Sequence, residues 1–231
     1  MEGKSLNHAT NNQEAGSPVQ SVGFWSAVLA TACSLLHVIG QIGEWLGWLG
    51  SQGGPNSSST VTGLVILLTP SLFLGSAFLI LIVSIHQITP IHKKIWSQLA
   101  VVFATAYTVL ISTVYFVQLT LVAPRIAQGR IDGIEMFLFV PFDSYLYAVD
   151  LLGYSFMSLA TLFASRVFVG GGLLKVIRLF LTANGFLIPF LVLQMYYHPL
   201  LWIASLWAVT FPVSTWALAI FFRKDNNPFI V

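Results

Sequence analysis

Two stretches of the sequence carry polar and ionisable side chains at the spacing of one helical face. The first polar row consists of His37, Gln41, Glu44 and Trp48. The second polar row consists of Asp143, Tyr147, Asp150 and Tyr154. Steps of three and four residues place side chains above one another on an α-helix. Carboxylates, an imidazole and phenols in such rows can bind a small solute or pass protons.

Other polar residues in apolar stretches complete the set of site candidates. The candidates for ligand binding or proton relay are His37, Gln41, Glu44, Tyr115, Gln118, Arg125, Asp150, Tyr154, Asn184, Gln194 and His198. We expect Glu44 and Asp150 to be the charged groups of the site. His37 and His198 are the candidate proton partners, and Arg125 is a candidate gate or counter-ion.

A purely structural role is the alternative for each candidate. An ionisable group at the centre of a membrane helix costs about 2.5–3.5 kcal/mol, so each one needs a compensating contact. Amides such as Gln41 and Asn184 commonly join neighbouring helices, at about 1 kcal/mol each. Glu44 and Asp150 lie near expected helix ends, where headgroups or an ion pair with Arg125 would satisfy them.

The sequence predicts no metal site, no cofactor and no catalytic residue. A metal site would have to use His37, Glu44, Asp150 and His198. No His-x-x-x-His spacing supports that set, although zinc, manganese and iron accept such ligands. There is no Gly-x-Ser-x-Gly elbow, and Gly170–Gly172 is not followed by Lys-Ser or Lys-Thr. Cys33 is the only cysteine, which excludes an intramolecular disulfide.

The elements that position these residues are membrane-spanning helices. Only 8% of the 231 residues are charged and 56% are apolar, whereas soluble domains contain roughly 25% charged residues. About 20 mostly apolar residues cross the hydrocarbon layer, which is about 30 Å thick. We therefore expect membrane lipids around the chain. The net charge of +2 is not gathered on one face, which argues against nucleic acid as a partner.

The predicted fold is all-α, a polytopic transmembrane bundle within a domain over 22–224. We expect spans at about 24–49, 61–85, 96–122, 144–167, 173–195 and 199–222. Pro124 is expected to end the third span. Polar tails are expected over 1–21, where the composition predicts disorder, and over 225–231. Segment 131–142 is too short to cross the membrane, so we expect it to be interfacial or re-entrant and a candidate lid.

The positions of lysine and arginine predict that both termini are cytoplasmic. This orientation places eight of the ten basic residues inside and leaves Arg125 and Arg130 outside. Most site candidates then lie in the outer half of a cell (inner) membrane. An outward-facing polar cavity between the first, third, fourth and fifth spans follows. Aromatic residues expected to anchor the span ends are Trp45, Trp48, Trp96, Trp202, Tyr145 and Tyr147.

Proline and glycine add two architectural predictions. Dividing the spans into three plus three puts Pro70 and Pro189 in the middle span of each half. Interrupted helices at corresponding positions are typical of inverted-repeat transporters. Gly43 and Gly47 have the small-xxx-small spacing of closely packed helices. Packing within the bundle is the favoured interpretation, and homodimerisation through this pair is the alternative.

The function favoured by these patterns is binding or transport of a small solute or a proton through the outward-facing cavity. One alternative is a non-catalytic membrane sensor or assembly module whose polar residues only lock helices together. Another is a membrane-embedded enzyme that modifies lipid, which would need a nucleophile next to a base and lateral access from the bilayer. The patterns favour a protein that is not an enzyme.

Overall fold

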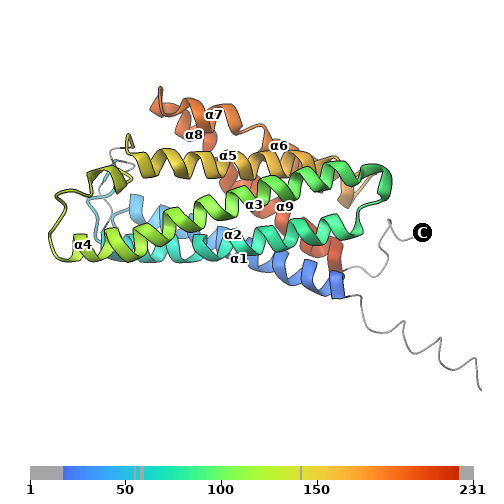
Figure 1. Cartoon of the computed structure of the whole chain (residues 1–231), viewed down its shortest axis with the longest axis horizontal. Coiled ribbons are helices and arrows are strands. Elements are labelled where there is room, and N and C mark those ends of the chain that lie inside the picture. The colour runs from blue at the N-terminus through green and yellow to red at the C-terminus, as the bar shows by residue number, and fades with distance from the viewer. Residues whose placement is uncertain (1–17, 55, 58–59, 141, 224–231) are drawn as a thin grey trace, which may run out of the picture.

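The fold consists of helices joined by turns. The computed structural model describes residues 18–54, 56–57, 60–140 and 142–223, and it contains no strand within them (Figure 1). Six helical stretches are long and apolar enough to cross a membrane. The prediction of an all-helical fold with six helices of this kind is therefore confirmed. The tail expected over 225–231, and residues 1–17 of the tail expected over 1–21, lie outside the described residues.

Three of the spans are single helices and three are composite. The single ones are α1 (Pro18–Trp45), α2 (Val61–Ile88) and α5 (Tyr145–Ser165). The third span joins η1 (Ile91–Lys93), α3 (Lys94–Val117), the π-helical turn η2 (Gln118–Val122) and α4 (Ala123–Ala127). The fifth joins α6 (Leu173–Gly185) and α7 (Ile188–Leu193). The sixth joins η4 (His198–Leu200), α8 (Leu201–Ala204) and α9 (Trp207–Arg223).

The six spans close into a ring. Contacts run from α1 to α2, α3, α5, α6 and α9 in turn, and α9 packs back on α1. Inside the ring, the Phe78 ring lies 5.7 Å from Tyr107 and 5.4 Å from Phe211 between centroids, so aromatic contacts join α2, α3 and α9. Large apolar side chains such as Phe73 and Trp216 stay more than half exposed outside the ring. An outer surface of this kind suits hydrocarbon as the surrounding medium.

The first span is shifted toward the N-terminus relative to the prediction of 24–49. Proline is favoured in the first turn of a helix, and α1 begins at Pro18, so 18–21 belongs to the helix rather than to the tail. Its end is set by Gly47, which has a φ of 74°. The Trp48 amide donates to the Gly43 carbonyl at 2.9 Å and the Gly47 amide to the Glu44 carbonyl at 3.0 Å. This pair of bonds is a Schellman motif, which stops a helix at a left-handed glycine.

Pro124 does not end the third span, so this expectation is wrong. In a regular helix the proline ring would meet the carbonyl of Thr120, four residues earlier. The chain instead widens into η2, where the Ala123 amide donates to the Gln118 carbonyl five residues back. A π-helical turn of this kind makes room for the ring, and the helix continues to Ala127.

Only one of the two expected helix interruptions is present. α6 ends at Gly185, four residues before Pro189. In a continuous helix the ring of Pro189 would clash with the Gly185 carbonyl. A turn over Phe186 and Leu187 then leads into α7. By contrast, α2 runs unbroken through Pro70, where the flanking helices α1 and α3 hold it in place. The structure therefore lacks the matched pair of broken helices.

Segment 131–142, of which residue 141 is not described, lies against the bundle beside η2. It contains the short turn η3 (Glu135–Phe137) and buries Ile134, which is 3% exposed. Gln118 Nε2 donates to the Phe137 carbonyl at 2.6 Å and ties the segment to the third span. The Glu135 carboxylate accepts hydrogen bonds from the backbone amides of Glu135 and Gly133, which lower the pKa of that carboxyl.

Candidate functional site

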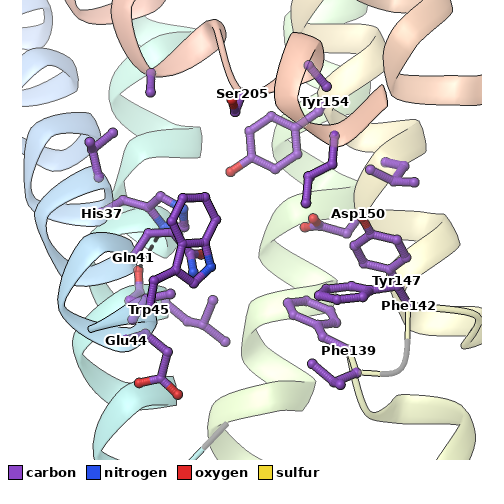
Figure 2. Close-up of a pocket in the computed structure, with 18 of the residues that line it drawn as sticks. His37, Gln41, Glu44, Trp45, Phe139, Phe142, Tyr147, Asp150, Tyr154 and Ser205 are labelled. Carbon is purple, nitrogen blue, oxygen red and sulfur yellow. Dashed lines mark hydrogen bonds between the residues drawn. The ribbon is translucent and has the colours of Figure 1, made fainter. Parts of the chain in front are cut away.

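Three residues of each polar row face each other across one cavity, whereas Trp48 and Asp143 are exposed and do not line it. The cavity has a volume of about 350 Å³ and is lined from both α1 and α5. Figure 2 shows His37, Gln41 and Glu44 on one wall and Tyr147, Asp150 and Tyr154 on the other. The candidates that line it are His37, Gln41, Glu44, Tyr115, Asp150, Tyr154 and Gln194. Cavities of a few hundred cubic ångströms with a few converging polar groups are typical of small-molecule sites.

The ring arrangement keeps α1 and α5 apart at this level. α2 and α3 separate the two helices on one side of the ring, and α6 and α9 separate them on the other. The short helices α7 and α8 project away from the bundle axis in Figure 1, and Leu191 of α7, together with Ser205 just after α8, forms part of the cavity wall. Trp45 of α1 meets Trp202 of α8 at 5.4 Å between ring centroids. The cavity is therefore lined by long helices and by a short helical hairpin.

Glu44 is buried against the start of α2. Its side chain is 4% exposed, and neither carboxylate oxygen makes a well-formed hydrogen bond, although the Thr60 backbone and the Ser51 side chain lie close enough to interact with it. A Cβ at Gly63 would lie within 3.0 Å of both oxygens, so only glycine admits the carboxylate here. Thr60 caps α2 by accepting from the Gly63 amide at 3.0 Å. The positive end of the α2 dipole thus adjoins Glu44 and offers it partial electrostatic compensation.

Asp150 lies on the opposite wall among phenols. Its side chain is 8% exposed, and Oδ1 has no hydrogen-bond partner. The hydroxyls of Tyr115 and Tyr154 are 2.9 Å apart, and Tyr115 also interacts with the Asp150 carboxyl. Asp150 and Tyr154 lie one helical turn apart on α5, whereas Tyr115 lies on α3. Three groups able to exchange hydrogen bonds with a ligand therefore meet on this wall.

His37 is held in place from α2. Its Nδ1 lies 2.6 Å from Ser71 Oγ and 3.2 Å from the Leu67 carbonyl oxygen. Because Nδ1 is engaged there, a ligand in the cavity would meet Nε2. The His37 ring also lies 5.5 Å from Trp207, which in turn lies 5.5 Å from Tyr154. Trp207 therefore bridges the two walls at the deep end of the cavity.

Tyr147 was predicted to be an interfacial anchor, but its side chain is buried and lines the cavity. It is 6% exposed, and its hydroxyl donates to Gln194 Oε1 at 3.1 Å. Gln194 Nε2 in turn donates to the Leu191 carbonyl at 3.2 Å. The rings of Tyr147 and Phe142 lie 5.1 Å apart, so α5 contacts the end of segment 131–142. The expected anchors Trp48 and Tyr145, in contrast, are 74% and 63% exposed.

Four candidates do not line this cavity. Gln118 lines a smaller one of about 160 Å³ beside segment 131–142. Asn184 lies between helices, where Nδ2 donates to Thr161 Oγ1 at 3.1 Å and Oδ1 accepts from Thr210 at 3.0 Å. Arg125 is half-buried on α4 and lines neither cavity. His198 stacks on Phe142 with ring centroids 4.6 Å apart.

Several lining residues were not among the sequence candidates. They include Trp45, Phe139, Phe142, Ser205 and Trp207. Trp45 follows Gln41 by four residues, so the helical spacing could have revealed it. Trp207 and Ser205 carry no such signal, because the sequence does not show that the hairpin of α7 and α8 folds against α1 and α5.

The described residues form no metal site, and the comparisons with known proteins find no relative. Among the described residues, no group of three His, Cys, Asp or Glu side chains could hold a metal ion. The alternative metal set is thus not assembled, since His198 lies outside the cavity that His37, Glu44 and Asp150 line. Comparison with protein-family models, with curated proteins and with solved structures finds no match.

Proposed function

We propose that this chain is a multi-pass membrane protein that binds a small solute between α1 and α5 and carries it across the membrane. The observation that supports this proposal is the cavity that three residues of each polar row line. A carboxylate buried without a partner costs several kcal/mol in a low-dielectric setting, so proteins seldom keep one without a use. Glu44 and Asp150 are two buried carboxylates in a single cavity, and their neighbours compensate them only in part: Thr60 and Ser51 for Glu44, and Tyr115 for Asp150.

We further propose that the cavity faces the outside of the cell and that both termini are cytoplasmic. Six basic residues lie at the end of the bundle where α1 begins: Lys93, Lys94, Arg166, Lys175, Arg178 and Arg223. Lys93 Nζ donates to the Val167 carbonyl at 2.9 Å, which shows that the turn before α3 and the end of α5 meet there. Arg125 in the last turn of the third span, and Arg130 just after that span, lie at the other end. Positive residues favour the cytoplasmic side.

Thiol labelling of a cavity position tests this proposal. Ser205→Cys on a Cys33→Ala background places one reactive group in the cavity wall. We expect it to be labelled by membrane-impermeant methanethiosulfonates, with a trimethylammonium or a sulfonate head, in right-side-out vesicles. A carrier that alternates its access also exposes the position in inside-out vesicles. The matched control is Ser214→Cys on α9, which is fully buried, does not line the cavity and is expected to stay unlabelled.

The labelling pattern separates transport from the other functions. Labelling of Ser205→Cys from the outer side alone would contradict transport, and only the binding of a solute would remain supported. No labelling of Ser205→Cys from either side, with the protein folded, would remove the basis for a solute site. Labelling only in inside-out vesicles would contradict the proposed orientation.

A non-catalytic assembly module is the second candidate, and the hydrogen bonds of the amides favour it. Asn184 joins α5, α6 and α9, and Gln118 binds segment 131–142. Gln194 is likewise satisfied by Tyr147 and a backbone carbonyl. These three candidates thus act as structural contacts. They do not account for the burial of Glu44 and Asp150 in the cavity wall, where Asp150 Oδ1 has no hydrogen-bond partner.

A lipid-modifying enzyme gains no support from the one nucleophile-like contact near the cavity. Ser71 Oγ lies 2.6 Å from His37 Nδ1, which is the distance expected between a nucleophile and its base. Ser71 is fully buried, however, and does not line the cavity. Its hydroxyl also lies 3.0 Å from the Leu67 carbonyl, as serines in membrane helices commonly do. A substrate could not reach it.

A further inference from the structure

We propose that the ligand is a small organic cation with an alkyl-substituted ammonium group, an inference that rests on the proposed solute site. The composition of the cavity wall carries this inference. Among the described residues that line the cavity, two are acids, seven are Phe, Tyr or Trp, and none is lysine or arginine. A cavity with this lining attracts positive charge and repels negative charge.

The two acids provide the charge complement. Glu44 and Asp150 are both at least nine-tenths buried, line the cavity and keep carboxylate oxygens without hydrogen-bond partners. They approach it from opposite walls in Figure 2. Arg125 at the end of the third span does not line the cavity, so its charge does not neutralise the two carboxylates there. A cationic ligand would supply the missing counter-charge.

The aromatic rings select the kind of cation. The faces of Trp and Tyr attract cations within about 6 Å of the ring centre, and aromatic cages are the usual sites for quaternary ammonium groups. Trp207 and Tyr154 lie 5.5 Å apart at the deep end, and Trp45 and Tyr147 stand on the two walls. A metal cation would instead need several oxygen ligands at close range. The described residues hold no such cluster.

The hydrophobic wall explains why the substituents should be alkyl groups. Leu64, Leu151 and Leu191 line the cavity between the polar groups. Methyl groups on the nitrogen would bury apolar surface against them, which a hydrated inorganic cation cannot do. The volume of about 350 Å³ suits a molecule of a few carbon atoms and one charge.

Three ligands of similar shape and different charge test the inference on the purified full chain in lipid nanodiscs. They are choline, its neutral isostere 3,3-dimethylbutan-1-ol and the anion 3,3-dimethylbutanoate. Isothermal titration calorimetry is expected to show choline binding at least about tenfold more tightly than the alcohol, and no binding of the anion. Equal or tighter binding of the alcohol or the anion would overturn the cationic ligand and leave a solute site in place.

Variants then assign the selectivity to the cavity. Glu44→Gln, Asp150→Asn and Trp207→Leu are each expected to lower choline affinity by about tenfold or more, with alcohol affinity within about twofold. The matched controls are Asp132→Asn, an exposed acid outside the cavity, and Trp216→Leu, an exposed tryptophan on α9. If the cavity variants and the controls bind choline alike, the proposed cation site is wrong.

The outcome for the cation is separable from the outcome for the solute site. If choline, the alcohol and the anion all fail to bind at millimolar concentration, the cation inference fails. Labelling of Ser205→Cys would then still decide whether an accessible cavity exists, because that experiment does not depend on the ligand.

Discussion

Asn184 is the clearest structural contact among the polar residues of the six apolar helices, and its replacement gives a quantitative test. The side chain is fully buried and joins Thr161 of α5 and Thr210 of α9 at 3.1 and 3.0 Å. Interhelical hydrogen bonds in membrane proteins contribute about 0.6 kcal/mol on average and at most about 1.7 kcal/mol. With the void left by the amide, Asn184→Ala should lower the free energy of unfolding by about 1–3 kcal/mol.

The two hydrogen bonds of Asn184 should differ in strength. Thr161 accepts from the amide while its own hydrogen goes to the Ser158 carbonyl at 2.9 Å. Thr210 has one hydrogen, which is shared between Asn184 Oδ1 at 3.0 Å and the Leu206 carbonyl at 3.2 Å. A shared hydrogen gives a weaker bond. The coupling energy of Asn184→Ala with Thr161→Val should therefore exceed that with Thr210→Val.

Double-mutant cycles measure both coupling energies. Unfolding in mixed micelles with increasing dodecyl sulfate, followed by circular dichroism, gives the free energy of each variant. Thr105→Val is the matched control, because this exposed threonine donates only to the Val101 carbonyl of its own helix at 2.9 Å, and its effect should stay within about 0.5 kcal/mol. Coupling energies of zero for both pairs would refute the bridging role of Asn184. A stronger coupling with Thr210 would refute the assignment of the hydrogen.

Three further predictions concern packing and backbone geometry. Gly185→Ala should destabilise the fold by about 1–3 kcal/mol by thermal denaturation, because its Cβ would lie 2.6 Å from the Cβ of Leu162. Gly171→Ala, which has no neighbour within 4 Å, is the control and should be neutral; equal effects would contradict the close approach of α5 and α6. Gly47→Ala should cost about 1–2 kcal/mol through its left-handed φ of 74°, and an unchanged melting temperature would argue against the Schellman end of α1. Cys33, 6% exposed, should resist N-ethylmaleimide in the native protein and react after unfolding; rapid native labelling, followed by mass spectrometry, would show that α1 is packed differently.

The spacing of residues on single helices predicted much of the candidate site. His37, Gln41 and Glu44 share a face because the helical repeat is a local property of the chain, and all three line one cavity. The same spacing placed Tyr147 on the face of Asp150, although an interfacial role was predicted for it. Burial of Tyr147 depends on where α5 sits among its neighbours, which no local pattern encodes.

Predictions that depended on helix ends fared less well. Trp48 was assigned to the first polar row, but the left-handed turn at Gly47 ends the helix before it and leaves it exposed. The same turn places Gly43 on α1 and Gly47 beyond it, so the pair does not form one helical face. Homodimerisation itself stays a prediction. Arg125 was expected near the acids, but the continuation of the third span through η2 and α4 places it outside the cavity.

The sequence by itself determined the all-helical class, the six long apolar helices and which polar residues share a face of α1 and of α5. Hydropathy over about 20 residues and the helical repeat are both read from neighbouring residues, so no knowledge of the fold is needed. The tertiary structure alone decided that the rows meet across a cavity, that Asn184 and Gln118 are structural, and that Trp207 bridges the walls. Those outcomes depend on which helices are neighbours in the ring, and that order follows from packing between segments far apart in the chain.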